Sequence, residues 1–275
     1  MIVARTIEDC RSHRSKWKRV AFVPTMGALH AGHLSMIARS ASECRRTVAT
    51  IFVNPAQFGP AEDFARYPRQ LEQDLDLLRR TGTDLIFAPA VKEIYPERSI
   101  TFVEVKELDT ALCGASRPGH FRGVCTIVLK LFNIVQPDKA HFGAKDFQQA
   151  RIIRQMVRDL NVPIAIRVEP TVREPDGLAM SSRNRYLSPT ERSLAPSIYK
   201  ALQAIGTRAR AGEIDVTRLE SALHAALAAI PGSRIDYARI VDADTLQPMT
   251  RLDRPALAAV AVFLGTTRLI DNIVI

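Results

Sequence analysis

The stretch that most constrains this chain is a short apolar run followed by a glycine-containing turn and an amphipathic helix. Val20–Val23 consists of four consecutive apolar residues, the pattern of a fully buried strand of a parallel sheet. A proline ends that strand, and Gly27 and Gly32 permit turn conformations that other residues rarely adopt. Apolar residues then recur at helical spacing over Leu34–Cys44. The sequence therefore predicts a strand, a turn and a helix in direct succession.

Two histidines, His30 and His33, lie at the predicted start of that helix. A helix N-terminus carries unpaired backbone N–H groups and a partial positive charge, which suit a phosphate group. Imidazoles at that place can donate hydrogen bonds to charge that develops on a transferring phosphoryl group. A pair of histidines at this spacing is also common without any function, and a zinc site is a further alternative, although no third ligand stands at a recognisable spacing.

Composition narrows the class of protein. With 275 residues, 47% of them hydrophobic, the chain can form one large domain or two smaller ones with real cores. We expect no membrane span, because no run of eighteen apolar residues occurs, and no secretory signal. The four cysteines form no C-x-x-C pair and are typical of reduced thiols, so we expect a cytoplasmic protein.

The net charge of +9 raises the question of a nucleic-acid partner. Most of the excess is spread along the chain, and its one dense cluster, between Arg11 and Arg19, is typical of a solvated surface. No RNA-binding motif is visible, and a polyanionic small molecule such as ATP suits the same charge. We therefore expect no nucleic-acid partner, and a non-catalytic RNA-binding module remains as an alternative.

Strands and helices alternate over the first 170 residues, which predicts an α/β fold with a doubly wound parallel sheet. The further strands that we expect are 47–53, 84–88, 101–105, 139–143 and 163–168. The further helices that we expect are 6–15, one through Leu71 and Leu78, one over 124–135 and one that opens with Ala144, Lys145 and Asp146.

The pattern changes near residue 171. Ser188 begins a helix with the signature of a capping box and is expected to extend to about Arg210, and a second helix is expected to end at Ile230. Three strand-like runs follow, at 235–241, 256–263 and 268–275. We predict a nucleotide-binding domain over 1–171 and a smaller α+β domain over 172–275.

Several polar residues follow predicted strands, at the edge where open α/β sheets bind ligands. Gln57 can offer a donor and an acceptor to a substrate, and is about as well explained as a loop amide that bonds its own backbone. Lys145 supplies a point charge for a triphosphate, and Asp146 can accept from a ribose or cap a helix. Asp74 is a weak candidate for a magnesium ligand. Two serines and an arginine in 180–183 can close over phosphates, or form an ordinary polar loop.

Several motifs in one order make the chain similar to a known family. PTMGALHAGH resembles the H-x-G-H signature of the nucleotidylyltransferase superfamily, and MSSRN lies where that superfamily has a second loop. Four motifs that lie between these two resemble the pantothenate synthetase family, the pantoate–β-alanine ligases: FVNPAQFG, RYPR, GHFRGV and FGAKDFQQ. The resemblance extends from about residue 20 to 190 and weakens toward Ile275.

The resemblance implies a Rossmann-like domain, a C-terminal lid and a homodimer. It implies condensation of pantoate with β-alanine through a pantoyl-adenylate, with ATP as substrate and Mg²⁺ as its metal. Catalytic roles fall on His30, His33, Lys145 and Arg183, with His33 as the proton donor, and pantoate contacts on Gln57 and Gln149. ATP contacts fall on Met26, Gly27, Ala28, Leu29, His30, Ala31, Gly32, His33, Gly143, Ala144, Lys145, Asp146, Val172, Met180, Ser181, Ser182 and Arg183.

Three residues depart from what the family usually carries. Ala31 stands where an acidic or amide residue is frequent, and Ala144 where Glu or Gln is usual. Gln73 stands where some relatives have a carboxylate beside the metal. A nucleotidylyltransferase that acts on a phosphorylated acceptor is the principal alternative, because it uses the same H-x-G-H chemistry.

Overall fold

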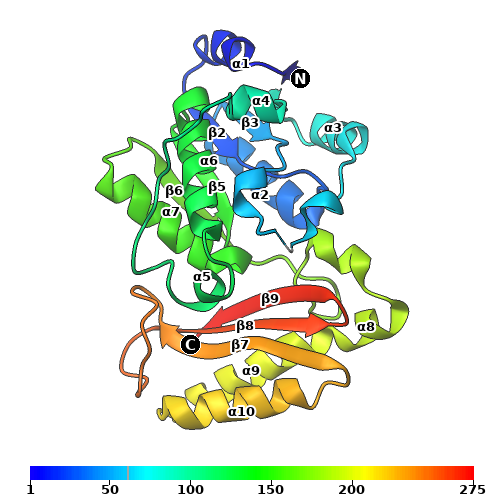
Figure 1. Ribbon diagram of the computed structural model, residues 1–275, viewed down its shortest axis with the longest axis vertical. Coiled ribbons are helices and arrows are strands. Elements are labelled where there is room, and N and C mark those ends of the chain that lie inside the picture. The colour runs from blue at the N-terminus through cyan, green and yellow to red at the C-terminus, as the bar shows by residue number, and fades with distance from the viewer. Residues whose placement is uncertain (61) are drawn as a thin grey trace. The chain divides into compact units, whose positions relative to one another are not determined.

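The computed structural model describes residues 1–60 and 62–275, which form two compact units. The first unit contains residues 1–106, 117–144 and 149–170, and the second contains 107–116, 145–148 and 171–275. Figure 1 shows the course of the chain through both units. Among the described residues, no helix is long and apolar enough to span a bilayer.

A six-stranded parallel sheet forms the centre of the first unit, in the order β1-β4-β3-β2-β5-β6. Its central strand β2 lies between β3 and β5, so the direction of winding reverses at this strand, which confirms the doubly wound α/β prediction. The strands are β1 (Ile2–Ala4), β2 (Val20–Val23), β3 (Arg46–Thr50), β4 (Leu85–Phe87), β5 (Lys139–Gly143) and β6 (Ala165–Glu169).

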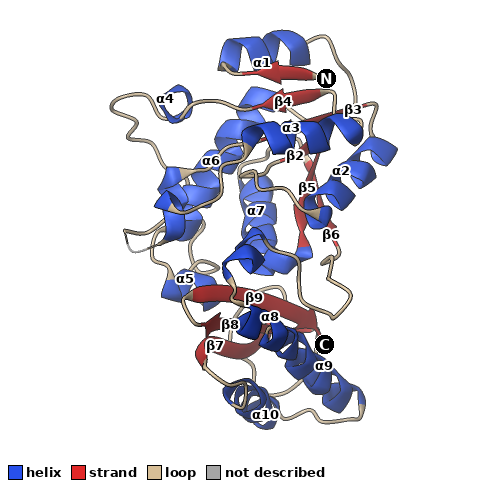
Figure 2. Ribbon diagram, turned by 90° about the vertical axis from the view of Figure 1, so that its right-hand side faces the viewer, coloured by secondary structure: helices blue, strands red, loops and turns tan. Residues whose placement is uncertain are grey.

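Helices cover both faces of this sheet (Figure 2). On one face, Val23 of β2 packs with Ile37 of α2 and Leu78 of α3 in a buried apolar cluster. On the other face, the ring of Phe132 of α6 makes edge contacts with the rings of Phe22 and Phe142, at centroid distances of 6.3 and 6.4 Å. The α-helices of this unit, or mostly within it, are α1 (Ile7–Arg14), α2 (Ala31–Glu43), α3 (Leu71–Arg80), α4 (Val91–Ile94), α6 (His120–Val135) and α7 (Phe147–Asp159).

The second unit is built on an antiparallel sheet in the order β7-β8-β9. The nearly continuous apolar strand β8 packs with helices α9 and α10 in one buried cluster, to which Leu202, Leu223 and Val260 belong. The elements are α5 (Leu112–Ser116), α8 (Pro189–Leu194), α9 (Pro196–Arg210), α10 (Val216–Ala228), β7 (Ser233–Asp242), β8 (Ala256–Leu264) and β9 (Thr267–Val274).

Two local predictions were wrong or incomplete, and one strand was missed. Residues 101–105 form no strand, and the exposed Phe102 lies against Arg122 instead of a neighbouring strand. The helix expected from Ser188 to about Arg210 is two helices, because Pro196 begins α9 directly after α8. Strand β1, which the sequence analysis did not anticipate, has only three residues and pairs with the distant β4.

We expect Gly123→Ala to destabilise the first unit. A Cβ atom at Gly123 would lie 2.0 Å from the carbonyl oxygen of Ala56, because α6 and the turn that carries Gln57 touch backbone to backbone. Overpacking of this kind costs about 1–3 kcal/mol, which urea denaturation would measure. Gly59→Ala is the matched control, since its Cβ would meet nothing closer than 3.7 Å. Equal stability of the two variants would contradict the prediction.

Candidate active site

The loop after β2 owes its shape to two consecutive left-handed residues, Gly27 and Ala28, with φ angles of 80° and 51°. A Cβ atom at Gly27 would lie 2.8 Å from a carboxylate oxygen of Asp74, so only glycine suits this position. The buried Asp74 accepts backbone hydrogen bonds from Ala28 and Leu29 at 2.8 and 2.9 Å. The carboxylate therefore holds this loop in place, and the hypothesis that it binds magnesium stays a prediction.

His30 and His33 form a reciprocal cap at the start of α2. His30 is the N-cap residue, and its Nδ1 accepts from the backbone N–H of Gly32 at 3.2 Å. Nδ1 of His33 accepts from the backbone N–H of His30 at 3.4 Å, and the ring centroids are 4.1 Å apart. Since each Nδ1 is an acceptor, a neutral ring carries its proton on Nε2. The cap thus sets the tautomer of both rings beside a helix N-terminus.

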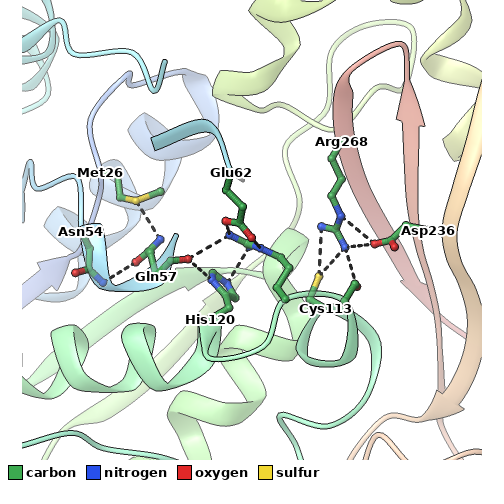
Figure 3. A network of polar contacts seen from close by, with 10 residues as sticks. Met26, Asn54, Gln57, Glu62, Cys113, His120, Asp236 and Arg268 are labelled. Carbon is green, nitrogen blue, oxygen red and sulfur yellow. Dashed lines mark hydrogen bonds and ion pairs between the residues drawn. The ribbon is translucent and has the colours of Figure 1, made fainter. Parts of the chain in front are cut away.

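Gln57 lies at the end of a short 3-10 turn, Pro55–Gln57 (η1), in contact with two polar neighbours (Figure 3). Its amide oxygen accepts from the buried Asn54 at 3.1 Å, and its amide nitrogen is 3.1 Å from the sulfur of Met26. Asn54 is fixed in turn by the hydroxyl of Tyr95 at 2.8 Å, and burial raises the pKa of that phenol to about 12. A thioether is a weak acceptor, so a substrate oxygen can replace it at the Gln57 amide.

A cluster of Glu62, Arg117 and His120 adjoins Gln57, and the sequence analysis assigned none of these three a role. Arg117 contacts both carboxylate oxygens of Glu62 at 2.7 and 2.5 Å, and His120 Nδ1 lies 2.8 Å from the backbone oxygen of Gln57 (Figure 3). Burial opposes ionisation of Glu62, but the hydrogen bonds and charge of Arg117 outweigh it and hold the pKa of Glu62 below its ordinary value. In the sequence, the Gly- and Arg-rich stretch 114–123 was the signal that could have indicated Arg117 and His120.

The carboxyl end of β5 lies beside that of β2, since the two strands pair in parallel from Ala21 and Lys139. Gly143 ends β5, and Ala144 begins a short 3-10 turn, Ala144–Asp146 (η3), that leads into α7. The partly buried Gln149 lies in the first turn of α7. The loops that follow β2 and β5 therefore leave the sheet as neighbours, at the switch point where doubly wound folds bind ligands.

The remaining predicted site residues belong to the second unit. Lys145 has its ammonium 4.0 Å from Asp146, and its backbone oxygen accepts from Asn272 at 2.9 Å. Val172 and Met180 are joined by a backbone hydrogen bond of 3.0 Å across a tight loop. Ser181 then caps the 3-10 turn η4 (Ser182–Tyr186), in which Ser182 is buried and Arg183 partly buried.

The described residues do not fit a metal centre held by protein side chains. In residues 1–60 and 62–275, no group of three His, Cys, Asp or Glu side chains is placed to hold a metal ion. Asp74 already accepts hydrogen bonds at both carboxylate oxygens. The described residues likewise offer no third ligand for a zinc ion at His30 and His33.

Comparison with known proteins identifies the family. A sequence model described as pantoate-beta-alanine ligase matches residues 2–274. The chain belongs to the pantoate–β-alanine ligase family. Proteins named pantothenate synthetase, from Moorella thermoacetica and Herpetosiphon aurantiacus, are each 51% identical to it and match over 100% of this chain and 99% and 100% of their own lengths.

Solved structures agree with this family assignment. Pantothenate synthetase from Thermus thermophilus has a TM-score of 0.95 and 48% identity over 99% of both chains. The pantoate-beta-alanine ligase from Francisella tularensis, whose structure is described as complexed with beta-gamma ATP and β-alanine, has a TM-score of 0.82 and 36% identity. That match covers 99% of this chain and 97% of the other.

We expect Asp74→Asn to weaken both the fold and the predicted nucleotide site of this ligase. An amide has one oxygen to offer where the carboxylate has two, so one backbone N–H of Ala28 or Leu29 loses its partner. An unpaired buried donor costs about 1–3 kcal/mol. Urea denaturation would measure this loss, and the KM for ATP would rise. Asp76→Asn on the exposed side of α3 is the control, and equal effects of the two changes would refute the role of Asp74.

The ion pair between Glu62 and Arg117 gives a pH-dependent prediction. Because the folded pKa of Glu62 is lowered, its contribution to stability is present above the unfolded pKa of about 4.3 and is lost as the pH falls through the folded value. Glu62→Gln should therefore destabilise the protein at pH 7, and the difference from the unsubstituted chain should shrink as the pH falls below about 4. Glu72→Gln, on the exposed face of α3, should show no such pH-dependent difference.

Proposed function

We propose that this chain condenses (R)-pantoate with β-alanine at the expense of ATP, through a pantoyl-adenylate. The observation that carries the proposal is the pair of capping histidines at the N-terminus of α2, in a chain that matches the ligase family from end to end. The ATP and β-alanine in the description of the Francisella tularensis ligase support the same two substrates.

In the first step, a carboxylate oxygen of pantoate attacks the α-phosphorus of ATP and forms an acyl–phosphate bond. The bond from that phosphorus to the bridging oxygen breaks, and pyrophosphate leaves with the electron pair. We propose that His30 and His33 donate through their Nε2 protons to the phosphates, with His33 as the principal donor, and that Lys145 and Arg183 neutralise charge. No covalent bond to the protein is needed, so the residues act by alignment and electrostatic stabilisation.

In the second step, the amine of β-alanine attacks the acyl carbon, AMP leaves as the acid anhydride is cleaved, and the amine loses a proton. We propose that Gln57 and Gln149 hold pantoate and that Gln57 also lies near β-alanine. The displaceable contact between the Gln57 amide and the Met26 sulfur supports this role. The other predicted ATP contacts, Met26, Gly27, Ala28, Leu29, Ala31, Gly32, Gly143, Ala144, Asp146, Val172, Met180, Ser181 and Ser182, remain part of the proposal.

We further propose that Mg²⁺ enters bound to ATP, since the described side chains offer no ligand set of their own. A C-terminal domain over 172–275 that closes as a lid would protect the adenylate from water. A homodimer in the cytoplasm, without nucleic-acid or membrane partners, completes the proposal.

His33→Ala should keep the fold and lose about 10²-fold or more in adenylation, the effect of removing one transition-state donor. The measurement is pantoate-dependent exchange of labelled pyrophosphate into ATP. His224→Ala, on α10 of the second unit, is the matched control and should exchange at the unsubstituted rate. Near-normal exchange by His33→Ala would remove the histidine from the mechanism.

Product analysis with ATP, Mg²⁺ and pantoate, with and without β-alanine, tests the reaction itself. Pantothenate and stoichiometric AMP should appear only when β-alanine is added. A nucleotidylyltransferase would release pyrophosphate and leave the nucleotide on its product, and an RNA-binding module would bind RNA with steep salt dependence and turn over no ATP.

A further inference from the structure

We propose that Asp271 and Asn272, adjacent residues of β9, are positioning residues for the nucleotide. Neither belongs to the predicted site. Asn272 contacts Lys145, which the proposed function assigns to ATP, and Asp271 contacts the loop between two other such residues, Val172 and Met180. The inference rests on that proposed function for the roles of Lys145 and of 180–183. All of the contacts that carry it lie within the second unit.

Asn272 fixes the backbone of the Lys145 segment. Its side-chain amide donates to the carbonyl oxygen of Lys145 at 2.9 Å, across 127 positions of sequence. Lys145 stands in a 3-10 turn of three residues, too short to define its own position by repeated hydrogen bonds. The hydrogen bond from Asn272 therefore holds the Lys145 backbone, from which the side chain extends, to strand β9.

Asp271 fixes a second segment through Arg173. The carboxylate of Asp271 is buried and accepts two hydrogen bonds from the Arg173 guanidinium, at 2.6 and 2.9 Å. The same guanidinium donates to the backbone oxygen of Gly177 at 3.1 Å and lies 3.4 Å over the ring of Tyr199. A bidentate pair with these additional contacts permits only one orientation of Arg173.

Arg173 belongs to the loop that leads into the predicted phosphate-binding residues. It forms an isolated antiparallel bridge with Ala179, and the N–H of Met180 donates to the oxygen of Val172 at 3.0 Å. Ser181 and the η4 turn follow directly, and η4 also packs against β9. Holding Arg173 therefore holds the start of the segment that carries Arg183.

The alternation of a β-strand explains how two adjacent residues can serve two segments. Successive side chains of a strand point to opposite faces. Asp271 shares its face with Leu269, which packs in the cluster that includes α9, so Asn272 points to the other face of the sheet. The spacing between the Lys145 backbone and the Arg173 loop is thereby set by one strand that is hydrogen-bonded along its length to β8.

The consequence for catalysis is geometric. Charges that hold the triphosphate act in the bound state as well as in the transition state, so a misplacement of about 1 Å weakens ATP binding along with the reaction and can cost about 10²-fold in kcat/KM. We expect Asn272→Ala and Asp271→Asn each to lower kcat/KM for ATP by about 10- to 100-fold, chiefly through KM, while the KM for β-alanine changes less than about twofold.

Asp242→Asn is the matched control. Asp242 is also a buried carboxylate of the second unit paired with an arginine, Arg254, but it holds the turn after β7. All three substitutions should lower the melting temperature, and only those in β9 should raise the KM for ATP. A purely structural role for β9 predicts the same ATP parameters for all three variants, and that result would overturn the proposal.

A double-substitution cycle makes the test specific. If Asn272 acts through Lys145, the loss in Lys145→Ala plus Asn272→Ala should not exceed the loss in Lys145→Ala alone, whereas additive losses would overturn the proposal. Should Asp271→Asn fail to fold, the Asn272 cycle still decides the matter.

Failure of the proposed function gives a different result. If the unsubstituted chain makes no pantothenate, the reaction is wrong, and calorimetric titration with ATP then tests the positioning role alone. Weaker ATP binding in Asn272→Ala than in Asp242→Asn would support it, and equal binding would refute it.

Discussion

The predicted active site depends first on one buried carboxylate. The loop after β2 contains two left-handed residues, one of them an alanine, and such a conformation persists only where the surrounding structure holds it. The N–H groups of this buried loop also need partners. Asp74 pairs two of them, at Ala28 and Leu29. That loop brings His30 to the N-cap of α2, where its ring replaces the serine or aspartate that usually fills this position. The helix start, its cap and the two imidazoles thus follow from a residue 41 or more positions away from them.

Periodicity predicted most of the fold because the apolar runs are long or unbroken. Val20–Val23 has no polar interruption and appears as β2, and 124–135 is long and apolar except at Thr126, Lys130 and Asn133 and appears as most of α6. The segment 101–105, wrongly predicted as a strand, is rich in residues of high β propensity, but it has no neighbouring strand to pair with, and pairing is a property of the whole fold. Strand β1 shows the converse, since three residues carry too little pattern to detect.

Site residues could be predicted where they belong to a short motif. They could not be predicted where their role depends on contacts with residues far away in the sequence. His30 and His33 are three residues apart, and their mutual cap is local. Asp74 acts on residues 45 and 46 positions away, and Arg117 contacts Glu62 across 55 positions. Residues 145–148 belong to the second unit for a similar reason, because they make contacts across a long sequence separation. The buried Gln148 donates to two carbonyl oxygens of the 107–116 segment, and no local sequence pattern predicts those hydrogen bonds.

The position of β1 has a consequence for the order in which the sheet can assemble. Among the described residues β1 has one sheet neighbour, β4, and the two strands pair in register from Ile2 and Leu85. Pairing β1 with β4 closes the long loop between Ile2 and Leu85, which costs conformational entropy. Three paired residues offset that cost only when β4 is already in place. The chain should therefore nucleate around β2 and β3, whose connection is a single helix, and β1 should join the edge late. A ribosome would release β1 long before β4 is synthesised, and the edge of β4 stays unpaired until β1 returns to it. Because that edge is only three residues long, it is a poor template for pairing with another chain.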